Sequence, residues 1–228
     1  MGDLKSLEEI AASRKGDLAA PYVIASVLRE AIYRGILQEG QPLRQAQIAL
    51  RLGVSPIPLR EALRILESEG LVAFSGYRGA FVTSLSLEEV REYYEIICRL
   101  EVHLLELAFP RITGSVVGEA RSVLELMEAE PDPIRWRELN ERFHSLLYEP
   151  AGRPITMSVA SRFRQNVDRY IRIHLPYMRE ESQRQHRQLL SLVEAGDLKG
   201  SLALLERHLL YTSDDLQNCM RKHMRARS

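Results

Sequence analysis

Histidine and asparagine residues in the C-terminal half of the chain have a spacing that suits metal coordination. Asn140 and His144 lie four residues apart, so both side chains project from one face of a helix. His186 and His208 fall on two later predicted helices. Three imidazoles and one amide oxygen directed into a helical bundle can bind a divalent metal and leave positions open for water or a carboxylate. Packed histidines without a metal are the alternative interpretation.

A metal with an open coordination position can also activate water, which is enzyme chemistry. We expect no enzyme activity, because no acid or base stands at a suggestive spacing beside the histidines. Glu141 is next to Asn140 and therefore points about 100° around the helix from it.

Amphipathic helices must hold these residues in place. Hydrophobic periodicity predicts helices over about 86–109, 115–128, 133–148, 154–175, 179–195 and 197–220, with breaks at Pro131, Gly152, Pro176 and Gly196. Ser86 and Glu89 have the spacing of a capping box at the start of the first helix. The pattern predicts an all-α bundle over residues 85–220 and a frayed basic tail over 221–228.

Residues 21–84 have short predicted helices followed by a hairpin, in contrast to the long helices of residues 85–220. Two short amphipathic helices are predicted over 45–52 and about 56–69, separated by a sharp turn at Gly53. Strands over 71–74 and 80–83 then flank a turn. Helix, turn, helix and hairpin in this order predict a winged helix-turn-helix domain, which lays one helix in the DNA major groove.

The start and the outer face of that second helix carry the groups expected to meet DNA. Ser55 is expected to cap the helix, and Pro56 and Pro58 are tolerated in a first turn. A buried stripe over the rest of the helix leaves Arg60 and Arg64, four residues apart, on the other side.

Length and charge agree with a two-domain DNA-binding protein. The chain has 228 residues, enough for two modest domains, and 31 basic side chains balance 31 acidic ones. Residues 44–78 nevertheless hold five arginines against three glutamates. We therefore expect salt-dependent DNA affinity confined to the N-terminal third.

The rest of the composition indicates a cytoplasmic protein. Cys98 and Cys219 have no metal-like spacing and are expected to be reduced and packed. No apolar run approaches the roughly 20 residues of a membrane helix, and acidic residues stand where a signal peptide would be apolar. Residues 1–20 are expected to form a mobile arm.

Five motifs follow one another in the N-terminal third: Leu28-Arg-Glu-Ala-Ile32, Leu52-Gly-Val-Ser55, Pro58-Leu-Arg-Glu-Ala-Leu63, Leu66-Glu-Ser-Glu-Gly-Leu-Val72 and Arg78-Gly-Ala-Phe-Val82. Together they resemble the DNA-binding domain of GntR-family transcriptional regulators. The resemblance implies contacts to operator DNA from Arg44, Arg51, Ser55, Arg60, Arg64, Arg78 and Gly79. The family usually has Arg-Thr after the serine, whereas this chain has Pro56-Ile57, so we expect an atypical operator preference.

The C-terminal half carries a second set of motifs: Asn140-Glu-Arg-Phe-His144, Ala151-Gly-Arg-Pro154, Gln185-His186 with Leu189-Leu190, Glu194-Ala-Gly-Asp197, and His208. This set resembles the FCD domain of the FadR-like GntR subfamily. In metal-containing members an aspartate and three histidines bind the ion, and an organic acid often completes the shell. The resemblance therefore implies a divalent transition metal (Zn, Ni or Mn) at Asn140, His144, His186 and His208.

Two departures from the subfamily change the expected effector site. Asn140 replaces the aspartate, so a metal site here carries one more unit of positive charge, which favours an anionic effector or weakens the metal site. Ile97 stands four residues before Glu101, where the subfamily often has an arginine. Arg169 and Arg172 are candidate replacements for effector binding, with solvated helix charges as the alternative.

The resemblance implies a homodimeric, ligand-responsive transcriptional regulator, most simply a repressor, whose helical domain binds a small organic acid and modulates operator binding. The alternative is a metal or small-molecule sensor, or an interaction protein, that no longer binds DNA. Pro56-Ile57 is the feature that favours this alternative.

Overall fold

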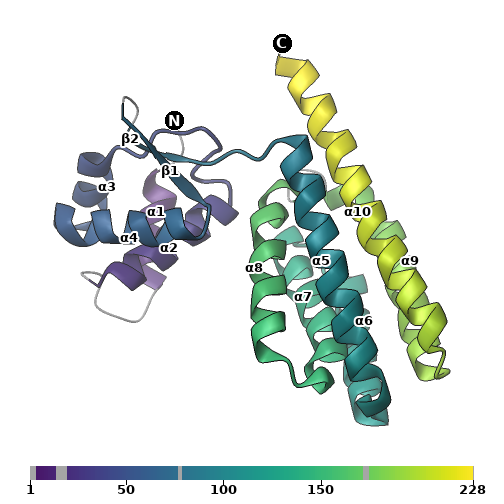
Figure 1. The fold of residues 1–228 in the computed structure, drawn as a ribbon. Helices are drawn as coiled ribbons and strands as arrows, with labels where there is room; N and C mark the ends of the chain where they lie inside the picture. Colours follow the sequence, from purple (N-terminus) through teal and green to yellow (C-terminus); the bar gives the residue numbers. More distant parts are fainter. Residues whose placement is uncertain (1–3, 14–19, 77–78, 172–174, 228) are drawn as a thin grey trace. The chain divides into compact units, whose positions relative to one another are not determined.

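The computed structural model describes residues 4–13, 20–76, 79–171 and 175–227. The chain divides into two compact units, Met1–Leu85 and Ser86–Ser228. The first unit combines helices with a small β-hairpin, and the second is helical throughout its described residues (Figure 1). The fold class predicted from the sequence is therefore confirmed.

The first unit is a helix-turn-helix domain with a two-stranded wing. Its elements are α1 (Leu4–Ser13), α2 (Pro21–Tyr33), α3 (Gln45–Leu52), α4 (Pro56–Ser68), β1 (Val72–Ser75) and β2 (Gly79–Val82). The strands are antiparallel, with Val72 opposite Val82, and lie within one residue of their predicted positions. One hydrophobic core joins the helices to the hairpin, so the domain holds α4 in a defined orientation.

Helix α1 lies where a mobile arm was expected, and that expectation is wrong for residues 4–13. Leu7, Ile10 and Ala11 are buried, and α1 packs against α2 and α3. These residues stand at i, i+3 and i+4, the spacing of a helix with one apolar face. The neighbouring charges hid this short stripe, which is stabilised by packing rather than by its own helix propensity.

The turn before α4 follows the prediction in its backbone but not in its cap. Gly53 ends α3 in the left-handed conformation, with φ 65°. Ser55 occupies the N-cap position, yet its side chain makes no capping hydrogen bond. The expected cap is wrong, and Pro58, at the third helical position, lacks one of the two N–H groups from which an N-cap serine can accept.

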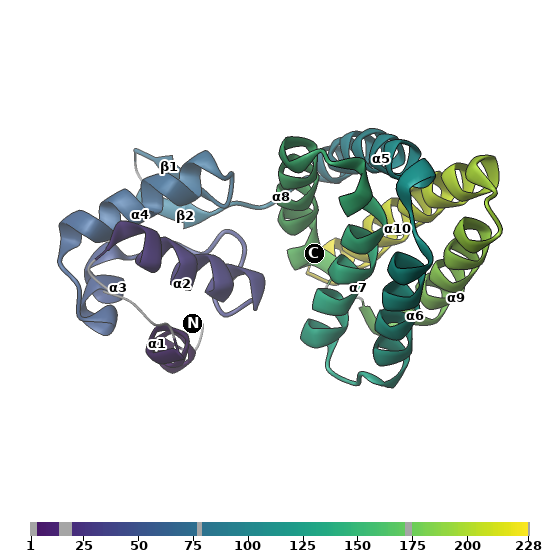
Figure 2. The same ribbon diagram turned by 90° about the horizontal axis from the view of Figure 1, so that it is seen from below.

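The second unit is a bundle of α-helices. They are α5 (Leu87–Ala108), α6 (Gly114–Ala129), α7 (Pro133–Tyr148), α8 (Pro154–Ile171), α9 (Leu175–Glu194) and α10 (Leu198–Arg227), with short 3-10 turns at Phe109–Arg111 and Glu149–Ala151. The capping box of Ser86 and Glu89 is present at the start of α5. Helices α5 and α10 lie side by side, as both views show (Figures 1 and 2).

Two predictions at the end of the chain are corrected. Helix α9 begins at Leu175 rather than near residue 179, because Pro176 lies in its first turn, where a proline is tolerated. The tail expected to fray over 221–228 continues α10 as far as Arg227. Among the helices in the described ranges, none combines the length and apolar character that crossing a membrane requires.

Candidate functional site

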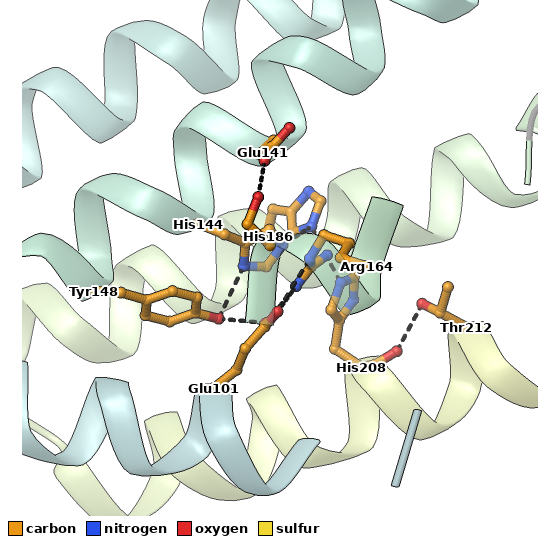
Figure 3. Close-up of polar contacts among 9 residues, drawn as sticks. Glu101, Glu141, His144, Tyr148, Arg164, His186, His208 and Thr212 are labelled. Atoms are coloured by element: carbon orange, nitrogen blue, oxygen red, sulfur yellow. Dashed lines mark hydrogen bonds and ion pairs between the residues drawn. The ribbon is translucent and has the colours of Figure 1, made fainter. Parts of the chain in front are cut away.

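Three buried histidines converge inside the second unit. His144 lies on α7, His186 on α9 and His208 on α10 (Figure 3). The Nε2 atom of His186 is 3.2 Å from Nε2 of His144 and 3.3 Å from Nε2 of His208. One ligand atom from each of the three residues lies within 4.8 Å of the others.

These separations fit a single metal ion. Two nitrogens that each lie about 2.0–2.1 Å from one ion are separated by roughly 2.8–3.4 Å when their angle at the ion is between 90° and 109°. The two Nε2 separations at His186 fall in this range. The histidine cluster could therefore hold a divalent ion.

Hydrogen bonds at the outer nitrogens orient two of the rings. Nδ1 of His144 lies 3.3 Å from the hydroxyl of Tyr148, and Nδ1 of His208 lies 2.8 Å from Oε1 of Gln185. The amide nitrogen of Gln185 donates to Glu181 at 2.6 Å, which turns its oxygen toward His208. His144 and His208 therefore carry hydrogen on Nδ1 and direct the lone pair of Nε2 inward.

His186 sits at the centre of the cluster and is fully buried. The rings of Trp136 and Phe143 lie against it, with centroid distances of 6.5 Å and 5.1 Å. Its Nδ1 atom is buried and has no hydrogen-bond partner among the residues that the structure describes. A buried polar atom without a partner is costly, so interactions at Nε2 must hold this ring in position.

The electrostatic environment keeps all three imidazoles neutral. Burial lowers the pKa of His144 and His186 well below the ordinary value, and it lowers the pKa of His208 to about 3. The positive charge of Arg164 lowers the pKa of each histidine further. Neutral imidazoles are the form that binds metal ions.

A buried ion pair adjoins the cluster. Arg164 of α8 donates through Nε and Nη2 to the carboxylate of Glu101 on α5, which is 2% exposed. The hydroxyl of Tyr148 donates to the same carboxylate at 2.8 Å, and burial raises the pKa of that phenol well above its ordinary value. Tyr148 therefore links the ion pair to His144 (Figure 3).

A cavity of about 30 Å³ opens beside these groups. Its lining includes Glu101, His144, Tyr148, Ser161 and Arg164. This volume holds one or two water molecules. A cationic side chain, a hydroxyl donor and an imidazole therefore surround space for a very small polar group.

Arg164, like its partners Glu101 and Tyr148, is a site residue that sequence reasoning missed. It stands on α8, the helix that also carries Arg169, but five residues earlier. Ile97, at the position where the subfamily often has an arginine, is fully buried. One signal was available, since Arg164 lies four residues after Ala160, on the inward apolar face of α8.

The structure confirms that the predicted histidines meet, and it leaves the predicted roles of Asn140, Arg169 and Arg172 as predictions. The structure brings together His144, His186 and His208, as predicted. Asn140 is half-buried one helical turn before His144, and its coordination of a metal stays a prediction. The side chain of Arg169 and the whole of Arg172 lie outside the described residues, so their proposed contact with an effector also stays a prediction.

The neutral histidines predict that metal-free protein loses stability in acid. Their folded-state pKa values lie below the ordinary 6.5, so below pH 6.5 the unfolded state binds more protons than the folded state. Stability should then fall as pH falls, with a slope that approaches about 1.4 kcal/mol per pH unit for each histidine well below pH 6.5. Urea unfolding in chelator at pH 7.5, 6.5 and 5.5 measures this.

Replacing one buried and one exposed histidine shows which of them causes the pH dependence of stability. His208→Gln should flatten the pH dependence, whereas His103→Gln should not, because the side chain of His103 is 56% exposed. An equal slope in wild-type protein and His208→Gln would contradict the prediction.

The first unit presents the groups predicted to contact DNA. Arg44, at the N-cap of α3, and Arg60 and Arg64, on the outer face of α4, are exposed. Arg64 is held by Glu67 at 2.7 Å and lies over the ring of Phe74, 4.4 Å from its centroid. The wing strand β1 thus fixes one arginine of the reading helix in position.

The other residues predicted to contact DNA differ in their surroundings. Arg51, at the end of α3, forms an ion pair with Glu8 of α1 at 3.1 Å. Ser55 is exposed and Gly79 begins β2 with a positive φ of 67°. Arg78 lies outside the described residues. The DNA contacts of all these residues stay predictions.

Comparison with known proteins identifies both units. Residues 23–82 match the family described as bacterial regulatory proteins of the gntR family, and residues 92–211 match the FCD domain. The chain belongs to the GntR family of transcriptional regulators, with an FCD domain following its DNA-binding domain. This is a family of DNA-binding regulators and not of enzymes.

Individual relatives agree with this assignment. The HTH-type transcriptional regulator YdhC of Bacillus subtilis is 31% identical over 144 residues, which cover 59% of this chain and 63% of that protein. The HTH-type transcriptional repressor GlaR of Escherichia coli is 28% identical over 206 residues, which cover 85% of this chain and 94% of that protein.

A solved structure extends the likeness over the whole chain. The crystal structure of a GntR family member from Pseudomonas syringae pv. tomato is 27% identical and has a TM-score of 0.56. The match covers 99% of this chain and 98% of that one. The likeness therefore spans both the DNA-binding domain and the FCD domain.

Proposed function

We propose that this chain is a ligand-responsive repressor that binds a near-palindromic operator as a homodimer. Support comes from the two halves together: a helix-turn-helix with exposed arginines, and a buried histidine cluster beside an arginine in the second unit. The relative GlaR is described as a repressor. Because the proposed partner is chromosomal DNA, we expect the protein in the cytoplasm.

The histidine cluster is proposed to bind one divalent transition metal ion (Zn, Ni or Mn). His144, His186 and His208 would supply nitrogen ligands and Asn140 an oxygen ligand. The two Nε2 separations at His186 and the neutral state of the rings support this. A bound ion supplies a Lewis-acid site for an anionic group. With a neutral amide in place of a carboxylate, the site would retain two positive charges.

The effector is proposed to be a small carboxylate. The fork of Arg164 suits bidentate binding of a carboxylate, and Tyr148 and Ser161 add hydroxyl groups at the same cavity. An entering carboxylate would compete with Glu101 for Arg164. The volume of about 30 Å³ limits the part of the effector that enters to a few heavy atoms unless Glu101 moves.

This competition suggests how effector binding reaches the DNA-binding domain. Glu101 belongs to α5, the first helix of the second unit, which follows the wing strand β2 along the chain after a short connection. An effector that takes Arg164 from Glu101 would change how α5 is held. The effector can weaken operator binding only by its difference in affinity between the DNA-competent and DNA-incompetent states.

A screen of short carboxylates against metal-loaded protein tests the proposal. Thermal shift measures binding, and fluorescence anisotropy measures release of an operator selected from a random duplex library. Arg164→Lys keeps the charge but loses the bidentate fork, so effector affinity should fall about tenfold or more while DNA binding persists.

Arg162→Lys is the matched control, because Arg162 is an exposed arginine on the same helix. It should bind the effector as the wild-type protein does. If the two variants respond alike, or if no carboxylate shifts either melting or DNA binding, the proposed effector class is wrong.

A further inference from the structure

An isoleucine stands where the reading helix meets its proposed target. Ile57 lies in the first turn of α4 and is 71% exposed. Pro56 and Pro58 on either side of it stiffen this turn, because each proline has a fixed φ. A large aliphatic side chain is therefore held in solvent at a defined position.

The position of Ile57 relative to the arginines indicates what covers it. Ile57, Arg60 and Arg64 stand at i, i+3 and i+7, so they share one face of α4. This face combines two cations with one apolar group at its N-terminal end. The cations suit the phosphate groups or the guanine edges of a DNA groove, and the N-terminal residues of a reading helix approach the base edges.

Only one group on the major-groove edges of the bases is apolar, the C5 methyl of thymine. We propose that Ile57 packs against a thymine methyl group and so selects a T·A pair in each half of the operator. The proposal rests on the DNA binding of the first unit and adds the base that this residue reads. An arginine at the same position would instead favour guanine, whose O6 and N7 accept hydrogen bonds.

Deoxyuridine provides a direct test, because it pairs with adenine as thymine does but lacks the methyl group. Duplexes that bind the full-length protein are selected from a random library, and their thymines are replaced by deoxyuridine at one symmetric pair of positions at a time. One such replacement should weaken binding by about fourfold for each methyl group lost.

Two variants test whether Ile57 causes the loss of affinity on replacement by deoxyuridine. Ile57→Ala should bind the thymine duplex more weakly than wild type and show no further loss on replacement by deoxyuridine. Leu50→Ala is the matched control, since Leu50 is 83% exposed on α3, and it should keep the full deoxyuridine effect. Thermal melting checks that both variants are folded.

Other results would overturn the proposal. Wild-type protein that tolerates deoxyuridine at every position would exclude a methyl contact. A deoxyuridine effect that persists in Ile57→Ala would assign the methyl contact to another residue. A library that yields no bound duplex would contradict DNA binding by this unit, and with it both this inference and the proposed function.

Discussion

Simultaneous replacement of Arg60 and Arg64 by alanine should reduce affinity for the selected operator by roughly 2–6 kcal/mol, because each arginine contact to a base is worth about 1–3 kcal/mol. Both side chains are exposed on the outer face of α4. Arg64 is also pre-positioned by Glu67 and by the ring of Phe74, so little ordering is needed when it binds. Fluorescence anisotropy at fixed salt measures the loss.

The salt dependence separates the two roles that an arginine can have. Loss of a phosphate contact lowers the slope of log K against log salt by about one, whereas loss of a base contact relaxes sequence preference at one position. Arg34→Ala is the control, because Arg34 is a half-exposed arginine of the same unit that pairs with Glu30. Operator affinity in the double variant equal to that of Arg34→Ala would contradict the proposed reading face.

Replacing His186 by alanine should remove the metal ion from the protein. Its Nε2 atom stands between those of His144 and His208, so the variant loses the ligand nearest to both others. The affinity should fall by more than the roughly 10–100-fold that loss of an outer hydrogen-bond partner costs. Elemental analysis of protein purified without chelator should find about one ion per chain in wild type and almost none in the variant.

Thermodynamic linkage gives a second measurement of the same site. Zinc at 100 times its dissociation constant should stabilise wild-type protein by about 2.7 kcal/mol and the His186→Ala variant hardly at all. His103→Ala should behave as wild type, since His103 is an exposed histidine of the same unit. A wild-type protein that contains no metal and does not respond to zinc, nickel or manganese would refute the metal site.

The hydrogen bond from His208 to Gln185 predicts an intermediate result. Gln185→Leu should weaken metal binding by about 10–100-fold, because the imidazole loses the partner that sets its tautomer. Gln183→Leu is the matched control. Gln183 is also buried on α9, but its amide donates to the carbonyl of Leu124 and not to a histidine. Equal metal affinity in the two variants would remove Gln185 from the site.

Local features of the sequence were sufficient to predict most of the helices and both strands. Apolar residues at helical spacing, prolines at helix starts and glycines at turns predicted the helices of both units except α1, because these signals act within a few residues of chain. Two of the wrong predictions, at α1 and at the cap of α4, also concern short stretches of sequence. The apolar stripe of α1 is only three residues long, and Pro58 removes one of the two N–H groups that could have donated to Ser55.

The sequence by itself determined that a winged helix-turn-helix precedes a helical bundle, and that three histidines stand on separate helices of this bundle. Only the tertiary structure decided that their Nε2 atoms meet, and that Arg164 is paired with Glu101, 63 residues away along the chain. The physical reason is that hydrophobic periodicity defines which face of a helix is buried. Which buried polar groups then meet depends on how helices distant in sequence pack together, and periodicity does not encode this.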